Sequence, residues 1–334
     1  MKKNLFLGAV TAFVTVSSFA QSGYKLTKTF HVASGGGWDY ITVNPQSNKL
    51  YLSHGTQVNI VDKNTGDSLG VVSNTTGVHG IAFINELNKG YTSNGRINNV
   101  TVFDLKTNAA ITQIATGENP DAIFYEPFSK TIITCNGRSK DLTIIDAATD
   151  KVVATIPVGG KPETAVSDEA GKVFVNIEDK NEIVVIDIKT KSVVAHWALG
   201  DAEGPTGLAI DVKTKRLFAG CEKKLVVVDA ANGKVVTTVA IGDGCDGVAF
   251  DSNTKTIFTS NGAAATMSVI KEVSKEKFEL VENVNSKKGA RTICVDESTH
   301  KVYMPTADFE PQAAGEKGRP KMIPGSFQVI VFEK

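Results

Sequence analysis

The strongest constraint on this chain is a short apolar pattern that returns at a regular interval. The pattern is a run of apolar residues that closes in aspartate, and its first five copies end at Asp62, Asp104, Asp146, Asp187 and Asp229. Their spacing is about 42 residues, which is the length of a repeat unit in several known architectures. A sixth copy ends at Lys271, and a seventh ends late, at Phe332, because a segment has been inserted before it. Seven copies predict seven structural units of one kind.

Each unit reads as four short β-strands. In the second unit, apolar runs at residues 80–83 and 90–93 precede the run that ends at Asp104, and in the third unit a fourth run covers residues 152–156. No helical periodicity competes with this pattern. Four short strands in each unit of about 40 to 50 residues are typical of β-propellers. The sequence therefore predicts an all-β, seven-bladed β-propeller that forms a single domain over residues 21–334.

The last unit lacks its fourth strand. Its first three strands are expected near residues 291–295, 301–304 and 327–332, after which only Glu333 and Lys334 remain. Residues 24–32 precede the first complete unit and alternate in the manner of a strand. We expect this N-terminal strand to pair with the C-terminal blade, because that pairing closes the ring and removes the open sheet edges.

The aspartates of the repeat have a structural interpretation. They precede turns such as Asp62-Lys63-Asn64-Thr65, in which a carboxylate can accept hydrogen bonds from backbone N–H groups nearby. We expect them to shape the turn between the third and fourth strands, and they are poor candidates for catalysis.

Residues 1–20 have the composition of an export signal. Lys2 and Lys3 give a positive start, residues 5–16 are apolar but too few to span a bilayer, and Ser18-Phe19-Ala20 offers a cleavage site. The alternative is an uncleaved anchor, although no cysteine follows that could carry a lipid. We expect a cleaved signal peptide, a mature protein in the periplasm or outside the cell, and no transmembrane segment after signal removal.

Charge and cysteine content exclude several classes of protein. The 36 basic and 36 acidic residues balance, and loss of Lys2 and Lys3 leaves the mature chain about two charges negative, so nucleic acid is not a predicted partner. No phosphate loop, nucleophile elbow, zinc-spaced cysteine set or cofactor fingerprint is found, and no cofactor is predicted. An oxidising compartment permits a disulfide between Cys221 and Cys245, whereas Cys294 reads as a core residue.

Several units also carry a family signature. Residues 91–94 (Tyr-Thr-Ser-Asn) and 258–261 (Phe-Thr-Ser-Asn) end second strands, and an apolar third strand closing in aspartate follows most of them. The chain resembles the YVTN-type β-propeller repeat family over nearly its whole mature length. Residues 289–292, 299–309 and 323–327 are similar to a group of exported bacterial propellers in that family. The resemblance implies the fold, but it implies no particular activity.

Candidate functional residues follow from propeller geometry. The first strands begin, and the second strands end, at the same rim of the central channel, so their terminal side chains are expected to converge on one funnel. This argument gives a candidate ligand-binding set: Trp38, Asp39, His54, His79, Asp121, Glu163, Glu178, Asp246, Arg291 and Asp308. Concave mouths with converging polar groups are the usual ligand sites. The structural alternative is that these residues are ordinary solvated strand ends, that the asparagines there satisfy turn backbone, and that Arg291 only neutralises carboxylates.

The inserted segment lies on the same side as this funnel. It runs from residue 306 to residue 325, joins the second strand of the last unit to the third, and contains three prolines. Loops of this length inside compact domains are usually functional or disordered. We expect an ordered cover over the funnel.

Three functions remain open at this point. The first is a binding or interaction protein that holds a small ligand or a partner segment at the funnel. The second is a lactonase or cyclising enzyme that uses His79, Glu163 and Arg291 to move a proton and to stabilise an anion. The third is a site for a hard cation such as Ca²⁺, with Glu163, Asp246, Asp121 and His79 as donors. Binding is the favoured interpretation, and no catalytic or metal-ligating residue is assigned.

Overall fold

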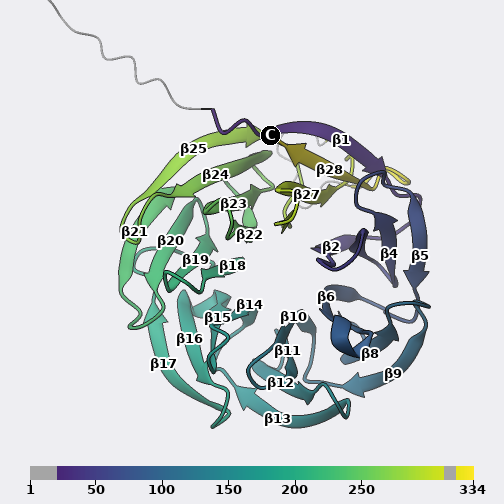
Figure 1. Ribbon diagram of the computed structural model, residues 1–334, viewed down its shortest axis with the longest axis horizontal. Helices are drawn as coiled ribbons and strands as arrows, with labels where there is room; N and C mark the ends of the chain where they lie inside the picture. Colours follow the sequence, from purple (N-terminus) through teal and green to yellow (C-terminus); the bar gives the residue numbers. More distant parts are fainter. Residues whose placement is uncertain (1–20, 312–320) are drawn as a thin grey trace, which may run out of the picture.

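The computed structural model describes residues 21–311 and 321–334, so the predicted signal peptide lies outside the described residues. The chain forms seven four-stranded antiparallel sheets, arranged as blades around a central axis (Figure 1). This is the seven-bladed β-propeller that the repeat predicts. In the described part of the chain, no helix is long and apolar enough to cross a membrane.

The strand bounds follow the repeat closely. Blade 1 contains β2 (Trp38–Val43), β3 (Lys49–His54), β4 (Gln57–Asp62) and β5 (Ser68–Val72). Blade 2 contains β6 (Val78–Ile84), β7 (Lys89–Asn94), β8 (Asn99–Asp104) and β9 (Ala110–Ala115). Blade 3 contains β10 (Pro120–Glu126), β11 (Thr131–Asn136), β12 (Asp141–Asp146) and β13 (Lys151–Pro157). Blade 4 contains β14 (Pro162–Ser167), β15 (Lys172–Ile177), β16 (Glu182–Asp187) and β17 (Ser192–Ala198).

The remaining blades complete the ring. Blade 5 contains β18 (Leu208–Asp211), β19 (Arg216–Cys221), β20 (Lys224–Asp229) and β21 (Val235–Ala240). Blade 6 contains β22 (Cys245–Asp251), β23 (Thr256–Asn261), β24 (Thr266–Glu272) and β25 (Phe278–Asn285). Blade 7 contains β26 (Cys294–Asp296), β27 (Lys301–Thr306), β28 (Gln328–Glu333) and β1 (Lys25–His31). Two single-turn 3₁₀ helices, η1 (Asn85–Leu87) and η2 (Glu178–Lys180), lie between strands.

The ring closes as the sequence predicts. Strand β1 pairs antiparallel with β28, with Lys25 opposite Glu333 and His31 opposite Gln328. Tyr24 and Phe30 are buried, and their rings pack into the clusters on the two sides of blade 7. The N-terminal segment therefore supplies the outermost strand of the C-terminal blade (Figure 1).

The core lies between neighbouring blades, so the second and third strands are covered on both faces. Strand β12, for example, has four consecutive buried residues in place of an alternating pattern. One cluster contains Ile144 of blade 3 together with Val175 and Val184 of blade 4. Sheets covered on both faces favour continuous apolar runs, which explains why the third strand was the clearest signal in the sequence.

The repeated aspartates have the predicted structural role. Asp62 Oδ1 accepts backbone hydrogen bonds from Asn64 (2.7 Å) and Thr65 (3.1 Å). Asp104 accepts the equivalent bonds from Lys106 (2.9 Å) and Thr107 (2.7 Å). These bonds fix the turn between the third and fourth strands.

A β-bulge interrupts the entry of five innermost strands. The register with the second strand shifts between Trp38 and Ile41, Val78 and Ile81, Pro120 and Ile123, Pro162 and Ala165, and Cys245 and Gly247. A bulge leaves residues unpaired and redirects their side chains. The bulges hold Asp39, His79, Asp121, Glu163 and Asp246, so this backbone irregularity is what positions the candidate site.

Two sequence expectations differ from the structure in detail. The first strand of blade 7 begins at Cys294 and not near Arg291. Arg291 and Thr292 make bonds to neighbouring blades: the carbonyl of Arg291 accepts from the Ser260 hydroxyl, and Thr292 Oγ1 donates to the Asp39 carbonyl (2.6 Å). Cys221 and Cys245 are free and buried, and burial raises the pKa of the Cys221 thiol to about 12. Cys294 packs against a core cluster, as expected.

Candidate functional site

Charged side chains from separate blades meet at one rim of the channel. His79 Nδ1 lies 2.5 Å from Asp39 Oδ2 and 3.7 Å from Asp121 Oδ1, which links blades 1, 2 and 3. Arg291 of blade 7 lies 3.0 Å from Asp39 Oδ1 through one terminal nitrogen, and its other terminal nitrogen bonds to Asp246 of blade 6. The structure therefore brings these five predicted residues into one network, while all of them keep part of their surface exposed.

Opposite charges within this network outweigh the cost of burial. Burial alone would raise the pKa of Asp39, but the hydrogen bond from His79 and the charge of Arg291 lower it. Burial alone would lower the pKa of His79, but the hydrogen bond to Asp39 and the charge of Asp121 raise it. His79 and Arg291 thus both favour the ionised form of Asp39.

Two carboxyl groups of blades 3 and 4, Asp121 and Glu163, have raised pKa values instead. Burial raises the pKa of Asp121 to about 6; the charge of His79 opposes this shift, and those of Asp39 and Asp246 add to it. Burial and the charge of Asp121 raise the pKa of Glu163 to about 8. Perturbed pKa values of this kind gather at functional sites.

Lys161 is a further member of the rim that sequence reasoning missed. Its ammonium lies 2.5 Å from Glu163 Oε1 and also pairs with Glu178, and these two carboxylates raise its pKa against the effect of burial. Glu178 lies at the start of η2, on the outer part of the rim. Its position in the sequence could have indicated this role, because Lys161 directly precedes Pro162 at the start of an innermost strand.

Tyr40 also belongs to this region. It follows Asp39 in the bulge of blade 1, yet its ring packs against the core cluster shared by blades 3 and 4. Burial, followed by the charges of Asp121, Asp39 and Glu163, raises the pKa of its phenol well above the usual range. Tyr40 therefore reaches from blade 1 to blades 3 and 4 and lies near the carboxylates of the rim.

One group of donors is close enough to hold a metal ion. Ligand atoms of Asp39, His79 and Asp121 all lie within 4.8 Å of one another. This set differs from the one inferred from the sequence, since it includes Asp39 and leaves out Glu163 and Asp246. Arg291 already bonds to Asp39, and its positive charge disfavours a cation there.

His54 is not brought to the open rim. Its side chain is fully buried, Nε2 contacts the Gly36 carbonyl at 2.8 Å, and Nδ1 contacts the Ser34 hydroxyl. Burial lowers the pKa of its imidazole, although its hydrogen bonds oppose this. Phe327 packs on its ring, with centroids 4.1 Å apart. His54 thus packs against the core between blades 7 and 1.

The asparagines at the ends of second strands have a structural role, as expected. They bond to side chains, however, and not to the turn backbone that the sequence suggested. Asn136 Nδ2 donates to Thr143 Oγ1 at 2.8 Å and to Asp141 Oδ1 at 2.6 Å, while its Oδ1 accepts from Thr134 Oγ1. Asn94 and Asn261 make the same side-chain bonds in their blades. Their partners are side chains of the same strand and of the third strand and not turn backbone, and the asparagine side chains are completely buried.

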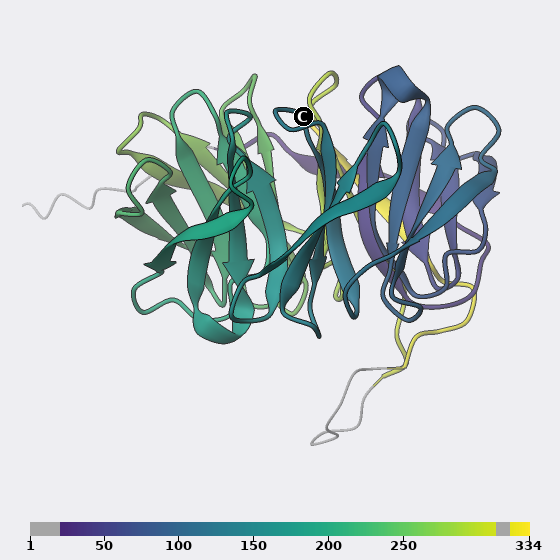
Figure 2. The same ribbon diagram turned by 90° about the horizontal axis from the view of Figure 1, so that it is seen from below.

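A cavity of about 510 Å³ opens on the rim between blades 6, 7 and 1. Its lining includes Trp38, Asp246, Arg291 and Phe309. Phe309 belongs to the inserted loop, whose residues 312–320 lie outside the described residues. The described stem is held by the bridge between Phe309 and Met322 and by the bond from Glu310 N to Lys321 O (2.8 Å). Figure 2 shows this yellow stem leaving the lower face of the ring.

Asp308 belongs to the same stem but not to the ionic network. Its side chain is exposed and pairs with Lys287 at 2.7 Å. Trp38, by contrast, packs against both Phe309 and Phe327 with tilted rings, whose centroids lie 6.0 Å and 5.6 Å away. The loop therefore contacts the site through its aromatic residue, and the cover predicted from the sequence is described only at its base.

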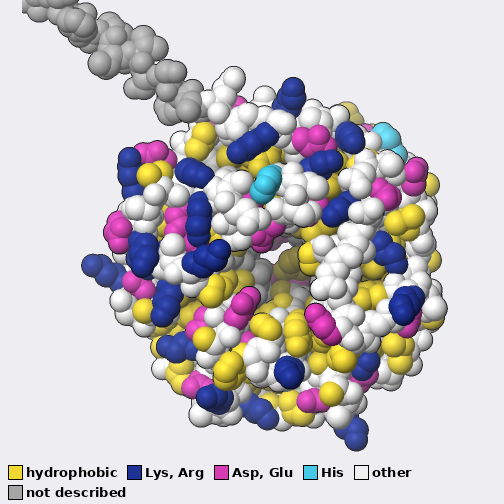
Figure 3. Space-filling model, in the orientation of Figure 1, with side chains coloured by type: hydrophobic (Ala, Val, Ile, Leu, Met, Phe, Trp, Pro, Cys, Tyr) yellow, Lys and Arg dark blue, Asp and Glu magenta, His cyan; other side chains and the backbone are white. Residues whose placement is uncertain are grey.

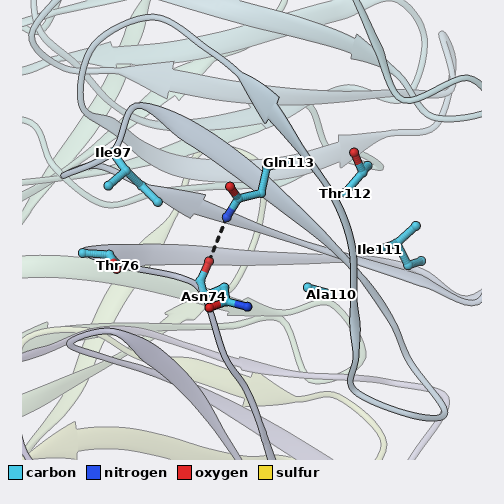
Figure 4. Close-up of a pocket in the computed structure, with 7 residues that line it drawn as sticks. All are labelled: Asn74, Thr76, Ile97, Ala110, Ile111, Thr112 and Gln113. Atoms are coloured by element: carbon cyan, nitrogen blue, oxygen red, sulfur yellow. Dashed lines mark hydrogen bonds between the residues drawn. The ribbon is translucent and has the colours of Figure 1, made fainter.

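Other surfaces offer less chemistry. A hollow of about 440 Å³ lies on the outer part of blade 2, where the Gln113 amide donates to the Asn74 carbonyl at 3.0 Å (Figure 4). None of its lining residues is charged. Figure 3 shows the face opposite the loop stem, where basic and acidic side chains are scattered around a hollowed centre. The rim with the ionic network and the cavity is thus the best candidate site.

Comparisons with known proteins agree on the fold. No family model and no curated protein matches the chain. Among solved structures, hydrazine synthase of Kuenenia stuttgartiensis is similar with a TM-score of 0.72 and 16% identity, over 88% of this chain and 96% of that chain. The WD40 repeats of RRP9 are similar with a TM-score of 0.77 and 9% identity, over 95% of this chain and 99% of that chain. Identities this low support the β-propeller fold alone.

Proposed function

We propose that this protein is an exported β-propeller of the YVTN-repeat type that binds a small ligand or a short partner segment at the acidic rim of its channel. Export rests on the composition of residues 1–20, and the repeat type rests on the resemblance described above. The binding function rests on one observation: bulges in five blades direct titratable side chains into the same space beside a cavity of about 510 Å³. That volume is in the usual range for small-molecule sites.

The energetics of the rim support this proposal. Glu163 and Asp121 are largely buried and repel each other, so their charged forms cost folding free energy. A structural role is better served by uncharged residues, as shown by the asparagine and threonine side chains deeper in the blades. Carboxyl groups kept at such a cost are expected to serve binding.

A thermal-shift screen of the mature protein tests the proposal. Metal ions, lactones and small metabolites of the periplasm are the probes, because a ligand that binds only the folded state raises its melting temperature. We expect at least one probe to raise it, and we expect Glu163→Gln to reduce that shift by half or more. Glu182→Gln is the matched control, since it makes the same change in blade 4 but at a site that contacts His196.

Two results would overturn binding at the rim. One is a probe whose thermal shift is unaffected by Glu163→Gln and by Arg291→Ala. The other is a pair of negative results. No probe changes the melting temperature, and no peptide or protein is found that binds the mature protein but fails to bind the Arg291→Ala variant. Arg291→Ala is also expected to lower stability, by about 1 to 3 kcal/mol, because it leaves Asp39 and Asp246 without their common partner.

A lactonase or cyclising activity is the second candidate, and the state of Glu163 favours it. A carboxyl group with a pKa of about 8 keeps its proton at neutral pH and can act as a general acid. His79 and Arg291 lie on the same rim, where they can move a proton and stabilise an anion. Lactone hydrolysis that falls with Glu163→Gln, but not with Glu182→Gln, would establish this activity in place of simple binding.

A further inference from the structure

The rim cavity joins an aromatic wall to a set of charged groups. Trp38 and Phe309 form the wall, and Phe327 packs against Trp38 from the loop side. Apart from these rings and the charged side chains, most of the lining is small, because four glycines from blades 6, 7 and 1 contribute backbone only. A ring-shaped ligand can therefore lie against the indole and phenyl faces, an arrangement that contributes beyond simple burial.

Two of these glycines are required by the geometry. Gly289 has a φ of +78°, and a Cβ there would come within 2.7 Å of the Phe309 ring. Gly244 has a φ of +71°, and a Cβ there would lie 2.7 Å from Ala263. Both substitutions would be strained by the backbone as well as by contact. The absence of a side chain at Gly289 thus lets the Phe309 ring pack closely on the backbone of blade 7.

The polar groups of the cavity offer donors and few acceptors. Arg291 has five N–H donors, and its terminal nitrogens bond to Asp246, Asp39 and the Trp38 carbonyl, so its Nε and one terminal hydrogen have no partner among residues 21–311 and 321–334. Lys288 lines the cavity and forms no ion pair in the same described part of the chain. Asp246 is the acidic lining residue, and it shares the guanidinium of Arg291 with Asp39.

From these contacts we propose that the cavity binds a small planar aromatic carboxylate, with its ring against Trp38 and Phe309 and its carboxylate near Arg291 and Lys288. This inference rests on the proposed binding function and gives it a ligand class. An arginine with unused N–H groups suits a carboxylate better than a neutral group, because charge-assisted hydrogen bonds are the stronger ones. An aromatic amine is disfavoured at this position, since its ammonium group would meet the positive charges of Arg291 and Lys288.

Intrinsic fluorescence allows a direct measurement. The chain has two tryptophans, and Trp197 lies on the outermost strand of blade 4, where it packs against Phe174. In a Trp197→Phe background, Trp38 is the one remaining tryptophan and reports on the cavity. The probes are benzoate and 2-naphthoate, compared with benzamide, benzylamine and cyclohexanecarboxylate. We expect the two aromatic carboxylates to change Trp38 emission and to raise the melting temperature, with dissociation constants at least about fivefold lower than those of the other three.

Point variants connect that signal to the cavity. Phe309→Ala and Lys288→Gln should each weaken binding of 2-naphthoate about fivefold or more. Lys287→Gln is the matched control, since the Lys287 ammonium pairs with Asp308 outside the cavity, and it should change binding less than about twofold. Gly37→Leu gives an independent check, because a Cβ at Gly37 meets nothing within 4 Å and a larger side chain can fill the cavity without strain.

The outcomes separate the ligand class from the general function. Equal or tighter binding of benzylamine or benzamide, or binding of 2-naphthoate that Phe309→Ala and Gly37→Leu leave intact, would overturn the inference. If none of the five probes binds while another compound gives a thermal shift that Glu163→Gln reduces, the ligand class is wrong and the proposed function stands. If neither these probes nor any other compound or partner binds at the rim, both are wrong.

Discussion

Glu163 is the residue whose environment departs furthest from that of a carboxyl group in water. Its side chain is only 12% exposed, it faces the charge of Asp121, and Lys161 alone compensates it. Burial is the largest cause of the rise in its pKa from 4.5 to about 8. At neutral pH the proton is therefore retained, although its sequence position alone would suggest an ionised glutamate.

This environment predicts how stability depends on pH. Because the folded protein holds the Glu163 proton more tightly than the unfolded chain does, folding is favoured by acid, and stability is lost as pH rises from about 4.5 to about 8. Glu163→Gln removes this loss, so the variant should be more stable than the parent at pH 8, by at least about 1 kcal/mol, and nearly equal to it at pH 5. Denaturant unfolding at the two pH values measures the difference.

Glu182→Gln serves again as the control, because Glu182 contacts His196 on the outer side of the same blade. That variant should not change the difference in stability between pH 5 and pH 8 by a comparable amount. A Glu163→Gln variant that is less stable than the parent at pH 8 would mean that Glu163 is ionised there and holds Lys161 as a structural ion pair.

At the scale of elements, the inserted loop and the bulges have separate roles. The bulges set the direction of the charged side chains within rigid blades, since each lies at the entry of a strand paired along the rest of its length. The loop adds an aromatic side chain from outside the repeat, through a stem that includes the bond from Ile323 N to Asp308 O (2.8 Å). Function in loops positioned by a rigid scaffold is a common arrangement.

Replacing residues 309–321 with a short Gly/Ser link should therefore leave the fold intact and remove binding at the rim. Strands β27 and β28 still pair from Val302 to Thr306, and Phe327 remains buried in the blade. We expect a melting temperature within a few degrees of the parent and loss of any ligand-induced shift. A companion replacement of residues 310–321 keeps Phe309 and should retain more of the binding. An unfolded product in both cases would show that the loop is part of the core.

At the scale of the whole molecule, ring closure depends on β1. Phe30 is 5% exposed, and its ring packs so closely on blade 1 that a Cβ at Gly66 would lie 2.5 Å from it. Removal of residues 24–32 would uncover this cluster and leave β28 as an open edge. The truncated protein should aggregate or melt well below the parent.

A milder pair of variants keeps this prediction testable if the truncation does not express. Phe30→Ala should cost about 3 kcal/mol, as large-to-small changes of buried aromatic residues do. Leu26→Ala on the same strand should cost much less, because Leu26 is 43% exposed. Equal stabilities for these two variants in denaturant unfolding would show that β1 does not close the ring.

The sequence by itself determined the number of blades, the order of strands and the closure. The reason is that these follow from a local pattern, repeated seven times, in which each third strand is apolar enough to be covered on both faces. It also identified Asp39, His79, Asp121, Glu163, Asp246 and Arg291 as rim residues, since strand position alone places them there. Their ion-pair partners and the directions of their pKa shifts could not be predicted from strand position.

Only the tertiary structure decided which of these groups pair and which remain uncompensated. Asp39 and Asp121 occupy equivalent positions, yet Arg291 reaches the first and not the second, so that one pKa is lowered and the other is raised. Tyr40 and Phe309 joined the site through contacts between blades that no local pattern encodes, whereas Lys161 joined it through its pairs with Glu163 and Glu178 within blade 4. The direction of a side chain at a bulge and its burial between distant strands depend on the whole ring, because both are set by the residues of other blades that pack against it.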